Sequence, residues 1–352
     1  MTPPPGGEPG EGPGGGSGGR PDGQQGPAEP PVPRASRRSR AWSALSVVVL
    51  VVVVVAGGWY LWSVRDEVGA ALAEIGIAAV LACLALTSVG VLATGACWRV
   101  WLAALADAPP ARTSHQVFYL TQSGKYLPGS LWPFLAQALL ARRFGVPRSA
   151  MLTATSLFLI THVVTGVAVG VLGAGPVVAA GWRWLLYPTA AAGLVLLLPP
   201  VLLRVVGLLD RVRASRGGTV HATPRDLGWS TVGRAVVLML AAWGTYGGAT
   251  WVLVRRLEPD PSGLPLAVGA YALAWVVGFL AVAAPAGVGA REATMVVVLA
   301  PLVGASAALA VALVSRVTLT VVDLGLAAAS APVLRAGPGP GVVPGRASGP
   351  PG

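Results

Sequence analysis

Two apolar stretches, each broken by glycine and proline, decide the fold of this chain. Residues 113–141 read TSHQVFYLTQSGKYLPGSLWPFLAQALLA, and residues 264–299 read LPLAVGAYALAWVVGFLAVAAPAGVGAREATMVVVL. Both exceed the roughly 20 residues that cross a bilayer core, but GKYLPG at 124–129 and PAGVGARE at 285–292 interrupt them. A broken helix at membrane depth must face protein or a water-filled cavity. We therefore predict two re-entrant or broken helical hairpins, named hairpin A (113–141) and hairpin B (264–299).

The composition places both hairpins in a membrane protein. Of the 352 residues, 54% are hydrophobic and 11% are charged, whereas soluble domains carry about 25% charged residues. The formal net charge of +11 comes from basic residues in short clusters between apolar runs. Such clusters set membrane topology, so we expect no nucleic-acid partner. Cys83 and Cys97 lie in one apolar run and are predicted to be packing residues.

Six further apolar runs predict complete membrane spans. They lie near residues 41–63, 70–97, 149–172, 182–203, 232–254 and 304–334. Residues 1–40 and 335–352 are rich in proline and glycine, so both are predicted to be disordered tails. The predicted fold class is an all-α polytopic membrane protein with one transmembrane domain at 41–334.

The basic residues predict an orientation for these spans. With the N-terminus in the cytoplasm, 18 of the 25 Lys and Arg residues fall in cytoplasmic segments and four fall outside. Counting either hairpin as a complete span would move later arginine clusters to the wrong face. We therefore expect a multi-pass protein of a bacterial plasma membrane with both termini in the cytoplasm.

The same order of elements occurs twice along the chain. Two spans, a hairpin and a span make up residues 41–173, and the same series makes up residues 182–334, with Pro128 and Pro285 at corresponding places. Because each half crosses the membrane three times, the second half is inverted relative to the first. Inverted repeats with interrupted segments indicate the substrate site of many transporters, so we predict a site where the two hairpins meet.

Hairpin A carries residues that suit an anion. Lys125, the one lysine in the sequence, precedes Pro128 and Gly129, where one half-helix ends and another begins. Free N–H groups at a helix start and a nearby ammonium favour a phosphate group. Tyr126 and Trp132 complete this half of the predicted site. The alternative is that Lys125 extends to the membrane interface and Trp132 lies in an interfacial aromatic belt.

Hairpin B carries a second pair of charges. Arg291 and Glu292 follow Pro285, Gly287 and Gly289. Neighbours in a helix point to different faces, so the two charges are predicted to have different partners. Glu292 is expected to interact with the N-terminus of its helix, and Arg291 with an anion or another carboxylate. The alternative is a charge pair that only locks the hairpin.

The last span contains Arg316 and Asp323, which are seven residues apart and therefore lie on one helix face. Charges inside a membrane are costly and point to function by default. We predict that Asp323 pairs with Arg316 or Arg291, with a purely structural pair as the alternative. His162 in the third span is predicted to be a hydrogen-bonded packing residue, with proton transfer as the alternative.

Catalytic motifs are absent from the sequence. The dipeptide Gly124-Lys125 resembles the end of a P-loop, but Tyr119 and Tyr126 occupy positions that need Gly and Ser or Thr. There is no nucleophile elbow, no metal-ligand motif and no pair of carboxylates on a common side. We therefore expect no enzymatic activity and no cofactor.

The segments GKYLPGSLWPFLAQALLARRFGVPR at 124–148 and PAGVGARE at 285–292 resemble the lysylphosphatidylglycerol synthase transmembrane, or flippase-like, family. The resemblance covers most of 41–334. It implies movement of lipids or lipid-linked precursors across the bilayer. It assigns the site to Lys125, Pro128, Gly129, Pro285, Gly287, Gly289, Arg291, Glu292 and Arg316. Many members have Glu-Arg and then Asp after hairpin A, where this chain has Phe158, Leu159 and His162.

Together these features predict transport of an anionic phospholipid or a polyprenyl-linked glycan precursor between leaflets. Aminoacyl transfer, which a separate soluble domain performs in the synthases, is not expected. One rival is a membrane enzyme acting on a lipid-linked sugar, which would need a catalytic carboxylate near a membrane face. The second rival is a non-transporting scaffold for a cell-envelope glycosyltransferase or lipid synthase. The scaffold predicts that Lys125 and Arg291 can be substituted without changing lipid distribution.

Overall fold

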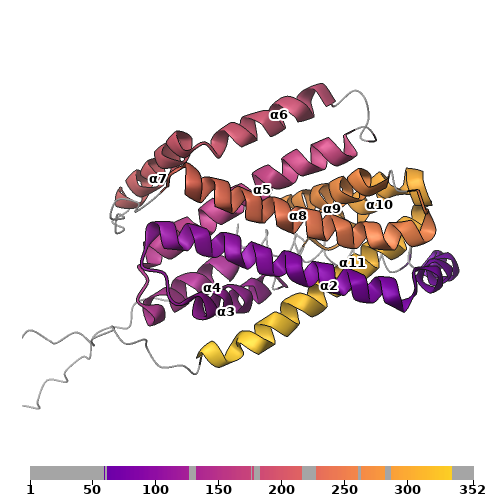
Figure 1. The fold of residues 1–352 in the computed structure, drawn as a ribbon, viewed down its shortest axis with the longest axis horizontal. Coiled ribbons are helices and arrows are strands. Elements are labelled where there is room, and N and C mark those ends of the chain that lie inside the picture. Colours follow the sequence, from indigo (N-terminus) through magenta and orange to yellow (C-terminus); the bar gives the residue numbers. More distant parts are fainter. Residues whose placement is uncertain are drawn as a thin grey trace, which may run out of the picture. The chain divides into compact units, whose positions relative to one another are not determined.

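Every regular element in the described part of the chain is a helix. The computed structural model describes residues 59, 62–126, 132–175, 177, 183–215, 227–260, 263–281 and 287–334. All of them belong to one compact unit, Leu45–Gly352. Within these residues, α-helices α2 to α11 are joined by loops and short 3-10 turns (Figure 1). The predicted all-α class is confirmed.

Four helices are long and apolar enough to cross a bilayer. They are α2 (Arg65–Leu105), α5 (Arg148–Ala174), α8 (Trp229–Leu257) and α11 (Ala305–Ser330), the last extended by the 3-10 turn η5 (Ala331–Leu334). They coincide with the predicted spans near 70–97, 149–172, 232–254 and 304–334. The predicted span at 41–63 lies almost wholly outside the described residues. The chain is therefore a multi-pass membrane protein.

The predicted span at 182–203 requires a correction, because it is not one straight helix. Helix α6 (Arg183–Leu196) and helix α7 (Pro199–Ala214) meet at an angle of 76°. Pro199 and Pro200 have no backbone N–H, and proline disfavours the helical conformation in the residue before it. The helix therefore ends ahead of the two prolines, and the pair is either a broken span or a re-entrant segment.

Both predicted hairpins are interrupted near their glycine and proline residues. In hairpin A, α3 (Ala111–Gln122) continues into the 3-10 turn η1 (Ser123–Tyr126), and α4 (Trp132–Ala141) follows the break. A second 3-10 turn, η2 (Arg142–Phe144), ends this segment. In hairpin B, α9 (Leu264–Leu280) and α10 (Ala290–Val303) are separate helices. The prediction that neither stretch is one continuous helix is confirmed.

The outer ends of the two hairpins, away from their breaks, lie at opposite ends of the helix bundle (Figure 1). Helix α10 ends directly before α11 begins, and there the Ser306 hydroxyl donates to the Glu67 carboxylate at the start of α2. At the other end, Arg143 follows α4 and donates to the carbonyl oxygen of Leu334 beyond the end of α11. The described residues next to the two breaks, Tyr126 in hairpin A and Ala281 in hairpin B, line one cavity inside the bundle.

Close helix contacts hold the hairpins in place. Helix α2 packs along α8 and α11, and α5 packs along α9 of hairpin B. A Cβ added to Gly173 would lie 2.9 Å from the Cα of Gly269, so the backbones of α5 and α9 approach closely. Small residues permit such approach between membrane helices. A side chain at Gly173 or Gly269 would therefore push α5 and hairpin B apart.

Candidate functional site

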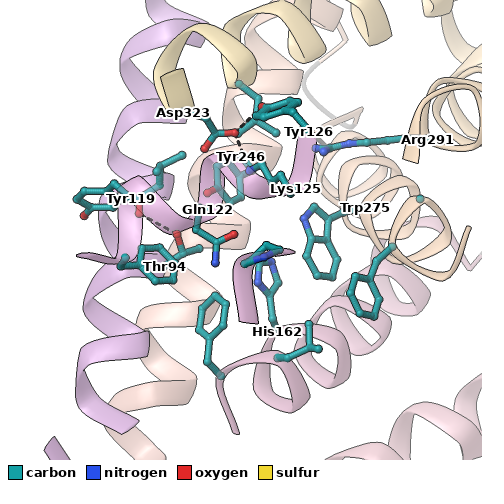
Figure 2. A pocket seen from close by; sticks show the side chains of 18 of the residues that line it. Thr94, Tyr119, Gln122, Lys125, Tyr126, His162, Tyr246, Trp275, Arg291 and Asp323 are labelled. Carbon is teal, nitrogen blue, oxygen red and sulfur yellow. Dashed lines mark hydrogen bonds and ion pairs between the residues drawn. The ribbon is translucent and has the colours of Figure 1, made fainter. Parts of the chain in front are cut away.

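A cavity of about 170 Å³ lies where the broken ends of the two hairpins meet. Hairpin A contributes Lys125 and Tyr126, hairpin B contributes Arg291, and α11 contributes Asp323 (Figure 2). Helix α11 also contributes Arg316. Side chains of α2, α5 and α8 complete the walls. The structure therefore brings five of the predicted site residues together from segments that are far apart in the sequence.

Asp323 pairs with hairpin A and not with an arginine, which corrects the predicted partner. Lys125 Nζ lies 2.6 Å from Asp323 Oδ2, and the Tyr126 hydroxyl donates to the same oxygen at 2.7 Å. Asp323 is 5% exposed, and a buried carboxylate needs such partners. The prediction of Arg316 or Arg291 was wrong because seven residues of helix separate Arg316 from Asp323 by about 10.5 Å, while η1 packs against the Asp323 end.

Arg316 pairs instead with Glu292 of hairpin B. Arg316 Nε lies 3.6 Å from Glu292 Oε1, while Glu292 Oε2 accepts a hydrogen bond from the backbone N–H of Gly289 at 2.7 Å. Glu292 therefore caps the start of α10, which is the predicted interaction with the helix N-terminus. The two neighbours Arg291 and Glu292 have different partners, also as predicted.

Arg291 faces the cavity without a carboxylate partner. Its guanidinium carbon lies 4.8 Å from the centre of the Tyr271 ring, and the residue is 8% exposed. Within the described ranges, no Asp or Glu forms an ion pair with it. A desolvated cation–π contact contributes about 2 kcal/mol, whereas burying an ion costs several kcal/mol. The cavity therefore presents a positive charge that its own carboxylates do not neutralise.

The other predicted site residues that the structure describes lie outside the cavity lining. Trp132 begins α4 and is 44% exposed. Gly287 and Gly289 have φ angles of +73° and +85° in the break of hairpin B, a conformation that favours glycine. A Cβ on Gly287 would also lie 2.6 Å from the carbonyl oxygen of Gly278, which lines the cavity. Three predicted residues lie outside the described part of the chain: Pro128, Gly129 and Pro285.

Aromatic rings of α9 form another part of the cavity lining. Tyr271, Trp275 and Phe279 all line the cavity, and Trp275 stacks on Phe279 with ring centres 5.5 Å apart. These residues were not predicted from the sequence, because they lie in a uniformly apolar run. The signal that would have found them is their four-residue spacing, which places three aromatic rings on one helix face.

His162 is enclosed by aromatic rings at the edge of the cavity. Its imidazole stacks on Trp275 with ring centres 3.8 Å apart, and Phe158 contacts it edge-on. Neither ring nitrogen has a hydrogen-bond partner among the residues that the structure describes. The prediction of a hydrogen-bonded packing residue was therefore wrong about the hydrogen bond, because the apolar rings around His162 carry no acceptor aimed at it.

A buried polar network fixes hairpin A against its neighbours. Gln137 on α4 donates to Thr121 Oγ1 on α3 at 3.2 Å and accepts a hydrogen bond from the Thr155 hydroxyl on α5. The indole N–H of Trp98 on α2 donates to Thr155 Oγ1 at 3.1 Å. Leaving one such buried group unpaired costs about 1–3 kcal/mol. The network therefore couples the position of η1 and Lys125 to three neighbouring helices.

The chemistry of the cavity favours anion binding. Its charged donors are an ammonium and two guanidinium groups, and guanidinium forks match the geometry of phosphate oxygens. No group of three His, Cys, Asp or Glu side chains suited to a metal ion is found in the described segments.

The comparison with known sequences agrees with this architecture. The sequence profile of the family described as "Lysylphosphatidylglycerol synthase TM region" matches residues 44–327. The chain belongs to this family. The match includes both hairpins and nearly all of the four spanning helices, and it confirms the resemblance that GKYLPG and PAGVGARE carry. No curated protein matches the sequence. Membership in this family indicates a membrane protein that takes part in lipid-related processes.

Proposed function

We propose that the cavity binds the negatively charged headgroup of a membrane lipid and that the protein moves this headgroup between the two leaflets. The observation that carries the proposal is Arg291, a buried guanidinium that lines the cavity and has no carboxylate partner among the described residues. A buried charge without a counter-ion is strongly disfavoured. A bound phosphate would supply the counter-ion through two parallel N–H···O bonds.

Lys125 can contact the same ligand without leaving Asp323. An ammonium group has three N–H donors, and the ion pair with Asp323 uses one of them. The Lys125 side chain is 32% exposed, so the remaining donors are accessible from the cavity. A headgroup held between Arg291 and Lys125 would therefore contact both hairpins at once.

The opposed hairpins supply the path that transport requires. Hairpin A opens at the end of the bundle where α11 ends, and hairpin B opens where α11 begins (Figure 1). We infer that residues 41–173 and 182–334 form an inverted repeat of six spans, with both termini in the cytoplasm of a bacterial cell. Substrate sites of inverted-repeat transporters lie between the repeats near the bilayer midplane.

Membership in the family supports a lipid as the ligand of the cavity. The cavity lies among apolar helices of a membrane protein in lipid-related processes. Moving a phosphate through hydrocarbon without compensation is prohibitive, and the buried cations would reduce this cost. The proposal requires no chemical step, so we expect the purified protein to be a transporter and not an enzyme.

The test is translocation of a labelled anionic phospholipid in proteoliposomes. We expect Arg291→Ala and Lys125→Ala each to slow translocation roughly tenfold or more, because a hydrogen bond to a charged group contributes about 1.5–3 kcal/mol. Arg148→Ala is the matched control, since Arg148 is an exposed arginine at the start of α5. Gel filtration and thermal unfolding would verify that each variant is folded.

Two results would contradict the proposal. Wild-type rates no higher than those of empty liposomes would refute transport. A folded Lys125→Ala/Arg291→Ala double variant with the wild-type rate would place the lipid path elsewhere. Cells that carry the double variant would then be examined for their lipid distribution. If that distribution matched the wild type, either result would favour the alternative function, a non-transporting scaffold for a cell-envelope enzyme.

A further inference from the structure

The charged side chains around the cavity include one more cation than carboxylates. Three cations line it, namely Lys125, Arg291 and Arg316. Two carboxylates neutralise two of them, since Asp323 pairs with Lys125 at 2.6 Å and Glu292 pairs with Arg316 at 3.6 Å. Glu292 does not itself line the cavity and acts on it through its ion pair with Arg316. Apart from the three cations and Asp323, no described Asp, Glu, Lys or Arg lines the cavity. The adjoining hairpin tips, residues 127–131 and 282–286, contain no charged residue in their sequence.

These charges act on a ligand in a poorly screened environment. Asp323 is 5% exposed, and the side chains of Arg316 and Glu292 are each 15% exposed. Coulomb interactions at such sites are several times stronger than in water, so a net charge on the filled cavity is costly. With the imidazole of His162 neutral, one monovalent anion makes the filled cavity electrically neutral. A ligand with two or more negative charges leaves it negative.

We propose that Asp323 and Glu292 set the charge that the cavity accepts, and that its ligand is therefore a phosphodiester with one negative charge. A lipid-linked diphosphate, which carries at least two negative charges, is excluded by the same two carboxylates. This inference rests on the proposed function, because it assumes that an anion binds beside Arg291. It selects the phospholipid over the polyprenyl diphosphate as the class of cargo.

Asp323 and Glu292 are specificity residues in this proposal, and conservative variants of both are available. Asp323→Asn keeps an oxygen that accepts from Tyr126 and Lys125 but removes the negative charge. Glu292→Gln keeps an oxygen for the backbone N–H of Gly289, since glutamine also serves in a capping box. Each variant raises the net charge of the cavity by one, and Arg291→Gln lowers it by one.

The experiment measures binding of two lipids with identical acyl chains to the full-length protein in detergent. Dioleoyl phosphatidylglycerol carries one negative charge, and dioleoylglycerol diphosphate carries two or more. We expect the wild type to prefer phosphatidylglycerol by roughly tenfold or more. Asp323→Asn and Glu292→Gln should each shift the preference toward the diphosphate by a similar factor. Arg148→Gln, an exposed arginine that does not line the cavity, should leave the ratio unchanged.

Two further arms separate this inference from the proposed function. Arg291→Gln should weaken binding of both lipids, and unchanged binding in that variant would refute the anion site itself. Glycerophosphoglycerol, the same headgroup without acyl chains, should not displace the bound lipid at equal concentration. Displacement would assign the site to a soluble phosphodiester.

The inference is overturned if the wild type binds the diphosphate as tightly as the phosphodiester. It is also overturned if the ratio stays constant in both Asp323→Asn and Glu292→Gln while Arg291→Gln loses both lipids. In the second case the anion site would stand, but its carboxylates would not select the charge of the ligand. Two carboxylates from different helices are tested separately, so misfolding of one variant leaves the other to decide.

Discussion

At the scale of single residues, the charges inside the membrane are organised by Asp323, which pairs with Lys125 and accepts a hydrogen bond from the Tyr126 hydroxyl. Lys125, Arg291 and Asp323 were recognisable because each is a charge in an apolar segment. Their pairing depends on which turn of α11 lies beside η1. Local spacing contains no information on that register, so the Lys125–Asp323 pair could not be predicted.

His162 offers a residue-scale prediction about stability. Its two ring nitrogens are enclosed and have no partner among the described residues, and an unpaired buried polar group costs about 1–3 kcal/mol. The ring nevertheless packs against Trp275 and Phe158. We expect His162→Phe to unfold in detergent at or above the wild-type temperature, since the neighbouring cavity can accept the larger ring. His162→Ala should unfold at a lower temperature because it removes the packing.

The two variants are controls for each other, since both remove the imidazole and one keeps an aromatic ring. If His162→Phe lost as much thermal stability as His162→Ala, the imidazole nitrogens would have a hydrogen-bond partner in the membrane. The interpretation of His162 as an enclosed packing residue would then be wrong.

At the scale of elements, the sequence was most informative where glycine and proline end helices. The breaks of hairpins A and B follow from the glycines and prolines in GKYLPG and PAGVGARE, because proline lacks a backbone N–H and glycine destabilises a helix interior. The bend between α6 and α7 was missed, although Pro199 and Pro200 mark it. The predicted span at 182–203 runs through those prolines, because the apolar residues continue beyond them to Leu203.

The topology of the hairpins can be tested with single cysteines. If both hairpins return to the side from which they enter, residues 204–231 face the cytoplasm and residues 256–263 face outside. We expect an impermeant thiol reagent applied to intact cells to label Ser262→Cys and not Ser215→Cys. The native Cys83 and Cys97 are buried, so their background labelling should be low. Labelling of Ser215→Cys from outside would reject the orientation and the inverted repeat.

At the scale of the whole molecule, the cavity unites the two halves of the chain. The first half, 41–173, contributes Lys125 and Tyr126, and the second half, 182–334, contributes Arg291, Arg316 and Asp323. The order of spans and hairpins allowed the sequence to predict that such a site lies between the hairpins. It could not predict the aromatic lining from α9 or the charge left over at Arg291, because both depend on tertiary packing.

The central claim is that a lipid phosphate binds between the two hairpins at Arg291. An electron cryomicroscopy structure of the protein in nanodiscs that contain phosphatidylglycerol tests it most directly. We predict density for a phosphate about 3 Å from the Arg291 guanidinium, with Lys125 on its other side. An acyl chain or a protein side chain in that space, with lipid phosphates found only outside the helix bundle, would contradict the claim.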